Sequence, residues 1–183
     1  MTEDEQDRKC VERCLRGEAD AFAAILERYE RPVFNAVVRM GADREDARDI
    51  CQQIFIKIYQ HLDTYDPDRR FFSWLYRIAV NEAINEIRSK RAWEPLSEEM
   101  VLPRADPEQE MQASEQQSEI KVALLRLEMK YRLALIVRHF LQLTYEEAAH
   151  VLAVPEKTVK SRLFTARQLL REILAERRHA PRR

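Results

Sequence analysis

Basic, hydroxyl and aromatic side chains recur within nine residues near the carboxy-terminal end of this 183-residue chain. Lys side chains bind phosphates and guanine edges, and Ser and Thr hydroxyls contact bases or phosphates, so the set suits DNA recognition. A helix in the major groove presents such groups to base edges from its amino-terminal turns. The candidate DNA-contacting residues are Lys157, Thr158, Lys160, Ser161, Phe164 and Thr165.

Aromatic residues are interspersed with Arg in a second region, earlier in the chain. Aromatic rings stack on unpaired bases while cations hold phosphates, so the mixture favours single-stranded or opening DNA over intact duplex. An extruded base also needs a pocket, which the loop DTYDPDRR (63–70) and a polar side chain could supply. The candidate residues are Tyr65, Arg69, Arg70, Phe71, Phe72, Asn81 and Arg88.

Core packing is the alternative function of these aromatic residues. It competes with base stacking for Phe71 and Trp74, and for Trp74 it is the prediction that we make. We expect Phe72 and Tyr65 to be exposed.

Caps and helix breakers indicate the elements that position the first set. Thr144, with Glu147 three residues later, has the spacing of a capping box at the start of a short helix. Pro155 cannot continue that helix but suits the first turn of the next one. The sequence therefore predicts two consecutive helices, the second of them basic.

A helix-turn-helix is predicted for this pair. The spacing fits a small residue where the two helices cross, Ala149, followed by a residue in the turn, Ala153. A β-branched residue, Val159, then lies in the second helix. The turn residue is usually Gly, which Ala153 replaces. The alternative is an ordinary pair of helices with a solvated outer face. The expected inner face of the second helix comprises Val159, Leu163, Ala166, Leu169, Leu170 and Ile173.

Helical periodicity also dominates the amino-terminal half. Apolar residues recur at steps of three and four over residues 19–39, where Pro32 could kink or divide the helix. Gly41 is a candidate helix stop and Asp43 a candidate N-cap. The next helix has a polar outer face that includes Asp49, and a further helix is predicted over residues 71–91.

Charge is segregated along the chain although the formal net charge is only −1. Residues 69–91 hold six basic and two acidic residues, a net charge of +4. Residues 94–119 hold one basic and eight acidic residues, a net charge of −7. Residues 157–183 hold nine basic and two acidic residues, a net charge of +7. Solvated surfaces are the alternative explanation. We predict an all-α fold of two small helical domains, 1–92 and 118–183, joined by a flexible acidic linker over 93–117.

Several functional classes are excluded by composition. The 2 Gly residues argue against glycine-rich phosphate loops, and no apolar run reaches membrane-spanning length. The acidic amino terminus has no apolar core typical of a secretory signal, so we expect a cytoplasmic protein. Cys10 and Cys14 could form a redox or metal pair, but buried packing is favoured, and the His residues complete no zinc pattern. We expect no enzyme activity, cofactor, metal or small-molecule substrate.

Three passages together resemble bacterial sigma factors of the extracytoplasmic-function type. They are EDARDICQQIFIKIYQHL, FFSWLYRIAVNEAINEIRSKR and LTYEEAAHVLAVPEKTVKSRLFTARQLLREIL, and their order and separation also fit that family. The resemblance covers nearly the whole chain. It implies a non-enzymatic factor that binds core RNA polymerase and brings it to promoter DNA.

The resemblance assigns a role to each region. The helix with Asp49, Gln52, Gln53 and Ile56 is similar to the surface that docks on the coiled coil of the largest polymerase subunit. The loop from Asp63 to Arg70 and the following helix resemble the element that melts the minus-ten promoter region. The basic helix after Pro155 resembles the reader of the minus-thirty-five element.

The resemblance also implies an anti-sigma partner that masks both domains, and an acidic linker that threads the polymerase channel until RNA displaces it. A flexible spacer is the simpler explanation of the linker. Two other functions stay open. A stand-alone helix-turn-helix regulator would bind its operator without polymerase, and a decoy would sequester an anti-sigma factor without reading promoters.

Overall fold

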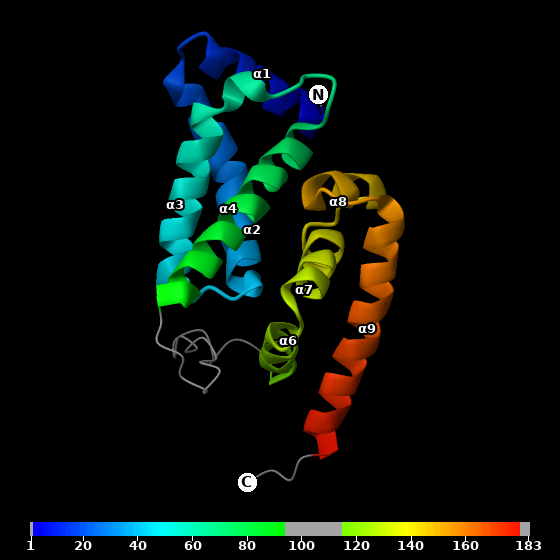
Figure 1. Cartoon of the computed structure of the whole chain (residues 1–183). Coiled ribbons are helices and arrows are strands. Elements are labelled where there is room, and N and C mark those ends of the chain that lie inside the picture. The colour runs from blue at the N-terminus through cyan, green and yellow to red at the C-terminus, as the bar shows by residue number, and fades with distance from the viewer. Residues whose placement is uncertain (1, 94–114, 180–183) are drawn as a thin grey trace.

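The computed structural model describes residues 2–93 and 115–179, and every regular element in these ranges is helical (Figure 1). This confirms the predicted all-α class. The predicted linker lies almost entirely outside the described residues. The amino-terminal half contains α1 (Glu3–Leu15), η1 (Ala19–Ala21), α2 (Phe22–Met40), α3 (Arg44–Gln60), η2 (Leu62–Thr64) and α4 (Phe71–Trp93). The carboxy-terminal half contains α6 (Glu115–Leu125), α7 (Met129–Leu135), η3 (Ile136–Phe140), α8 (Tyr145–Leu152) and α9 (Glu156–His179).

Helices α2, α3 and α4 pack into a bundle whose core lies between their apolar stripes. Helix α2 runs through Pro32 without being divided, and it ends at Gly41, whose φ of 115° is accessible to glycine. Asp43 then caps α3, accepting a hydrogen bond from the backbone N–H of Asp46 at 2.7 Å. Both the stop and the cap are as predicted.

Helix α1 was not predicted. Thr2 and Glu5 form a capping box at its start, a signal that the sequence carries. Its buried Asp7 accepts a hydrogen bond from the Tyr29 hydroxyl at 2.6 Å and pairs with Arg28. Asp4 accepts a hydrogen bond from the backbone N–H of Phe71 at 3.4 Å, so α1 also caps the beginning of α4.

The predicted helix-turn-helix is present as α8 and α9. Thr144 and Glu147 form both hydrogen bonds of the capping box, which fixes the start of α8. Ala153 lies between the helices with a φ of 50°, the left-handed conformation that usually selects glycine. Val159 is fully buried under the turn, so the three-residue pattern performs the predicted structural role.

The two halves pack directly against each other, which the sequence did not indicate. Helix α8 lies beside the first turns of α4, and α7 approaches α2 (Figure 1). The guanidinium of Arg132, 4% exposed, donates to the carbonyl of Met40 at the end of α2 across 2.6 Å. Buried apolar residues of both halves form one continuous cluster. No helix within the described ranges is long and apolar enough to cross a membrane.

Candidate nucleic-acid interface

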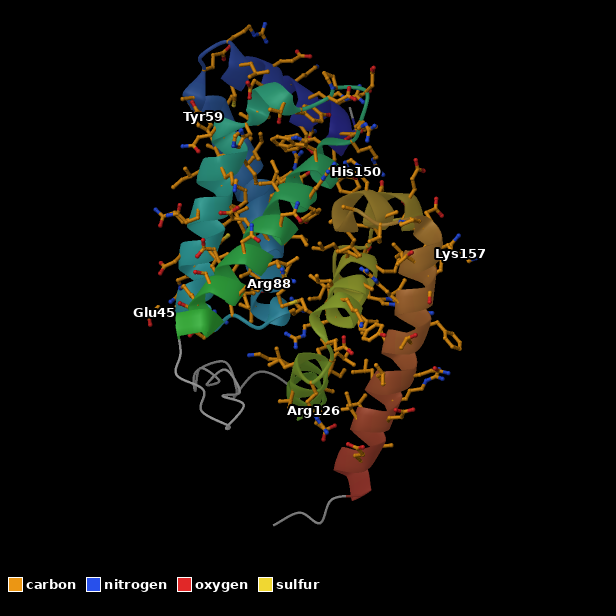
Figure 2. The ribbon with its side chains drawn as sticks, in the orientation of Figure 1. Glu45, Tyr59, Arg88, Arg126, His150 and Lys157 are labelled. Carbon is orange, nitrogen blue, oxygen red and sulfur yellow. The ribbon has the colours of Figure 1, made fainter. Side chains whose placement is uncertain are left out.

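The outer face of α9 carries the predicted duplex-reading residues. Lys157, Lys160 and Ser161 are exposed, and Phe164 is 64% exposed. Thr158 and Thr165 are half-buried at its edge. Figure 2 shows Lys157 on the side of α9 that faces away from the amino-terminal half. The buried stripe through Val159, Leu163 and Ala166 holds the opposite face, so a rigid support presents the basic face to solvent.

A cation–aromatic cluster positions Lys160. Its ammonium lies 3.3 Å from the Glu156 carboxylate and 5.1 Å from the centre of the Tyr145 ring. The guanidinium of Arg138 lies 5.2 Å from the same ring. Sequence reasoning missed Tyr145 and Arg138, because they precede the recognition helix by more than ten residues and only the fold brings them beside it.

Two predicted single-strand contacts are in the core instead. Tyr65, expected to be exposed, is 7% exposed, because its ring packs on Phe71 and Trp74 and its hydroxyl donates to the Arg69 carbonyl at 2.6 Å. Burial raises the pKa of the Tyr65 hydroxyl. Phe71 is fully buried against Tyr29 and Tyr65. These rings fold the loop and do not offer a face to a base, so the prediction of direct contact is wrong for both.

Trp74 is half-buried and packs against the core, in line with the prediction for it. Phe72 is half-buried as well, rather than exposed, with the Arg70 guanidinium 4.6 Å from its ring centre. Arg69 and Arg70 are exposed beside it. The structure therefore brings Arg69, Arg70 and Phe72 together at the start of α4.

Asn81 and Arg88 belong to a separate stripe along α4. Both are exposed, and because seven residues span about two helical turns they lie on one face. Phe72 precedes Asn81 by nine residues, about half a turn around the helix. Arg77, also exposed, precedes Asn81 by one turn and extends the stripe. The residues predicted to bind single-stranded DNA therefore do not form one pocket. They form a basic group at the start of α4 and a separate polar stripe along that helix.

The exposed face of α3 holds the remaining predicted residues. Asp49, Gln52 and Gln53 are exposed, and Ile56 is 43% exposed among them. A groove of about 1030 Å³ runs between α2 and α3 beside this face. Apolar side chains form its floor and Arg side chains line its rim: Phe22, Leu26, Phe34, Phe55, Arg31 and Arg48. In Figure 2, Glu45 and Tyr59 mark this edge of α3, opposite the carboxy-terminal half.

The cysteines are packing residues. Cys14 and Cys51 are buried. Burial raises the pKa of the Cys14 thiol above its ordinary value, and it raises the pKa of the Cys51 thiol to about 11. Both thiols therefore stay protonated at neutral pH and are poor nucleophiles and ligands.

Two family models match the chain. One, described as sigma-70 region 2, matches residues 25–93, and the other, described as sigma-70, region 4, matches residues 117–170. Curated relatives match along almost their full length. The RNA polymerase sigma-H factor of Pseudomonas aeruginosa is 33% identical over 95% of this chain and 96% of the relative. The ECF RNA polymerase sigma factor SigW of Bacillus subtilis is 31% identical over 92% and 97%.

Solved structures share the fold. CnrH, in complex with the cytosolic domain of CnrY, matches with a TM-score of 0.73 at 24% identity, over 93% of this chain and 98% of that one. The sigma factor RpoE of Bartonella quintana, in complex with the anti-sigma factor NepR, matches with a TM-score of 0.72 at 23% identity, over 84% and 96%. Both cover the two helical halves together.

Proposed function

The chain belongs to the sigma-70 family, in its extracytoplasmic-function branch, and from this premise we propose how its surfaces divide the work of initiation. As a non-enzymatic sigma factor it binds core RNA polymerase and directs promoter-specific transcription initiation. It acts in the cytoplasm, where polymerase and promoter DNA meet. The proposal concerns the residues that carry out each step.

The face of α3 docks on the polymerase. Asp49, Gln52 and Gln53 offer hydrogen-bond partners around the exposed Ile56. An apolar residue surrounded by polar ones is the pattern of a small protein interface, in which the centre excludes water and the rim gives specificity. The adjoining groove gives room for the side chains of a helical partner.

The start of α4 and its polar stripe hold the opened minus-ten region. Arg69 and Arg70 bind phosphates beside Phe72, while Asn81 and Arg88 contact the strand further along the helix. Tyr65 and Phe71 act indirectly, because they hold the loop that carries the two Arg residues. Their replacement would therefore destabilise the loop rather than remove a single contact.

The outer face of α9 reads the minus-thirty-five element as duplex. Lys157, Lys160 and Ser161 reach base edges and phosphates, Phe164 contacts thymine methyl groups, and Thr158 and Thr165 contact the backbone from the edge. The exposure of Phe164 carries this proposal, because a large apolar side chain that contributes so little to the core is explained by an external contact.

The division into domains is part of the proposal. Residues 1–92 form the polymerase-binding and melting unit, 93–117 the acidic linker, and 118–183 the duplex-reading unit. The net charge of −7 over residues 94–119 attracts that segment to a channel built for nucleic acid, from which RNA then displaces it. Because two proteins of this fold were solved with partners, one of them called an anti-sigma factor, we include such a partner.

Run-off transcription with purified core polymerase and genomic fragments tests the function. We expect specific transcripts only when the chain is added. Tight duplex binding without polymerase, and no transcripts with it, would instead identify a stand-alone regulator. Binding to an anti-sigma factor with neither of these activities would identify a decoy.

A further inference from the structure

Helix α1 has no part in the surfaces described above, and it precedes the residues that the sigma-70 region 2 model matches. Its residues Asp4, Asp7, Arg8 and Val11 recur at steps of three and four, so they lie on one face of the helix. Asp7 and Val11 are buried, so this face packs on the bundle. In Figure 1, α1 lies at the end of the bundle where the chain turns from η2 towards α4, and it contacts both of these elements.

Asp7 anchors α1 to α2. Its side chain is only 2% exposed, and it accepts a hydrogen bond from the Tyr29 hydroxyl at 2.6 Å while it pairs with Arg28. The Arg28 guanidinium also donates to the side-chain oxygen of Gln6 at 2.7 Å. A buried carboxylate is costly to separate from such donors, so these contacts fix the position of α1.

Asp4 connects this anchored helix to the start of α4. One carboxylate oxygen accepts a hydrogen bond from the backbone N–H of Phe71 at 3.4 Å, and the other lies 3.9 Å from Nε of Arg70. The first N–H groups of a helix have no partner within it, and a carboxylate is favoured at that end by the helix dipole. The acceptor for Phe71 therefore comes from a residue 67 positions earlier in the chain.

Arg8 reaches the loop before α4 through Tyr65. The Tyr65 hydroxyl donates to the backbone carbonyl of Arg69 at 2.6 Å. Burial raises the pKa of this hydroxyl, and a hydrogen bond from the Arg8 guanidinium of α1 opposes that rise. A chain of polar contacts thus joins α1 to the backbone of the loop, directly beside the two Arg side chains assigned to the opened strand.

We propose that α1 positions the promoter-opening loop (residues 63–70), and that Asp4 and Arg8 are positioning residues that hold Arg69 and Arg70 in place for the opened strand. This inference rests on the function proposed above. Neither Asp4 nor Arg8 touches DNA. They restrict the loop before binding, so that less conformational freedom is lost when its Arg side chains meet phosphates.

Asp4→Asn and Asp4→Ala form a matched pair, because both remove the charge and only Asn keeps an oxygen that can accept the Phe71 N–H. Each variant is combined with core polymerase and bound to a fluorescent single-stranded oligonucleotide carrying the non-template minus-ten sequence. Asp4→Ala should bind about three- to tenfold more weakly than Asp4→Asn, the range expected for a lost helix cap. Glu3→Ala is the control, because Glu3 is exposed in the same turn of α1 and should bind as wild type.

Arg8→Met and Tyr65→Phe test the second connection. Both remove a member of the same chain of contacts, so their losses of oligonucleotide affinity should not multiply, and the double variant should bind as Tyr65→Phe alone does. The salt dependence of binding separates positioning from contact. Arg8→Met should keep the wild-type slope, whereas Arg70→Ala, which removes a phosphate contact, should lower it by about 0.7.

Different results would overturn the two positioning roles. Equal binding by Asp4→Asn and Asp4→Ala would overturn the role of Asp4. Multiplying losses for Arg8→Met and Tyr65→Phe, or a lower salt slope in Arg8→Met, would overturn that of Arg8. Loss of core-polymerase binding in these variants would show general unfolding of the amino-terminal half and would count against both roles.

Run-off transcription by the wild type keeps this inference separate from the proposed function. Absence of specific transcripts with the wild type would reject the function. Normal wild-type transcription, together with equal binding by the two Asp4 variants and multiplying losses at Arg8 and Tyr65, would reject only the role of α1.

Discussion

Phe164 and Lys160 are the two residues of α9 for which the structure gives the most support to the proposed contact with DNA. The Lys160 ammonium is held between a carboxylate and an aromatic ring, so less side-chain freedom is lost when it meets a base or phosphate. Phe164 projects from the same face and is 64% exposed. Both residues are supported by α9 without contributing to its core.

Phe164→Ala should separate recognition from stability. Because the ring is largely exposed, we expect the free energy of unfolding to change by less than about 0.5 kcal/mol in urea denaturation. Transcription from a duplex promoter by the reconstituted holoenzyme should fall severalfold. A large loss of stability would show instead that the ring packs in the fold.

Ala153→Gly should stabilise the chain. An alanine at φ 50° is strained by about 1–2 kcal/mol, while glycine increases the entropy of the unfolded chain, so the expected net gain is about 0.5–1 kcal/mol. Thermal or urea denaturation of the full chain measures it. Ala153→Val serves as the control and should destabilise, because β-branched residues tolerate this conformation poorly. A loss of stability in Ala153→Gly would contradict the strain.

For single residues, the helix caps could be predicted from the sequence, whereas the burial of aromatic side chains could not. Asp43, Thr144 and Glu147 were identified as caps because their hydrogen bonds join residues three apart. Tyr65 was misplaced because its burial depends on Phe71 and Trp74, whose packing the loop composition does not encode. An aromatic residue among charged ones in a sequence can serve either purpose.

At the scale of elements, α8 does two things with one side chain. One oxygen of Glu147 accepts a hydrogen bond from the backbone N–H of Thr144 at 2.7 Å, and the other accepts one from Arg70 at 2.8 Å. His150 lies on the same helix, where burial, and then Arg77 and Arg69, lower its pKa from the ordinary 6.5. The charge of His150 is therefore coupled to the contact between α8 and α4.

Acid should weaken the packing of α8 on α4. The pKa of His150 is lowered where the halves are in contact, so a chain with separated halves binds this proton more strongly. The contact is therefore favoured fully above pH 6.5 and loses this advantage as the pH falls below it. We expect the radius of gyration to increase between about pH 7.5 and pH 5.5.

Two variants check the assignment of this pH dependence. His150→Gln should flatten the pH profile. His139→Gln should retain it, because His139 contacts Arg167 within the carboxy-terminal half and does not face α4. A profile that is unchanged in His150→Gln would contradict the role of His150.

Arg132 should be a large single contributor to stability. Its guanidinium satisfies backbone carbonyls of Leu124, Leu127 and Met40, and also that of Leu125. Arg132→Met should lower the free energy of unfolding by about 3 kcal/mol or more, since buried carbonyls would lose their donor. Urea denaturation of the full chain measures this loss. Arg132→Lys should recover only part, because one ammonium cannot reach all of these oxygens, and a loss below about 1 kcal/mol would contradict the role.

The helices were largely predictable, but their contacts were not. Periodicity identified the long helices and the helix-turn-helix, whereas α1 was missed although Thr2 and Glu5 signal its start. The pairing of Arg70 with Glu147 joins residues 77 positions apart. No local pattern specifies such a pair, so the packing of α8 on α4 could be found only in the folded chain.

At the scale of the whole molecule, the two nucleic-acid-binding surfaces that we propose are of different kinds and lie on separate halves. The amino-terminal half combines a basic loop with an exposed polar stripe on α4, and the carboxy-terminal half presents the basic face of α9. Where α8 packs on α4, Arg70 of the first surface pairs with Glu147 and Arg69 lies beside His150, whereas the outer face of α9 is exposed. Core polymerase supplies the scaffold on which both can act.

Transcription on two templates tests this division most directly. Wild type, Lys160→Ala and Asn81→Ala are each combined with core polymerase on an intact promoter and on a second template that has a pre-opened minus-ten bubble and no minus-thirty-five element. We expect Lys160→Ala to lose about tenfold on the intact promoter, as for one lost base contact, and little on the bubble template lacking the upstream element. Asn81→Ala should open the intact promoter slowly and bind core polymerase normally. Equal losses for Lys160→Ala on both templates, or loss of polymerase binding by Asn81→Ala, would contradict the division of labour between the halves.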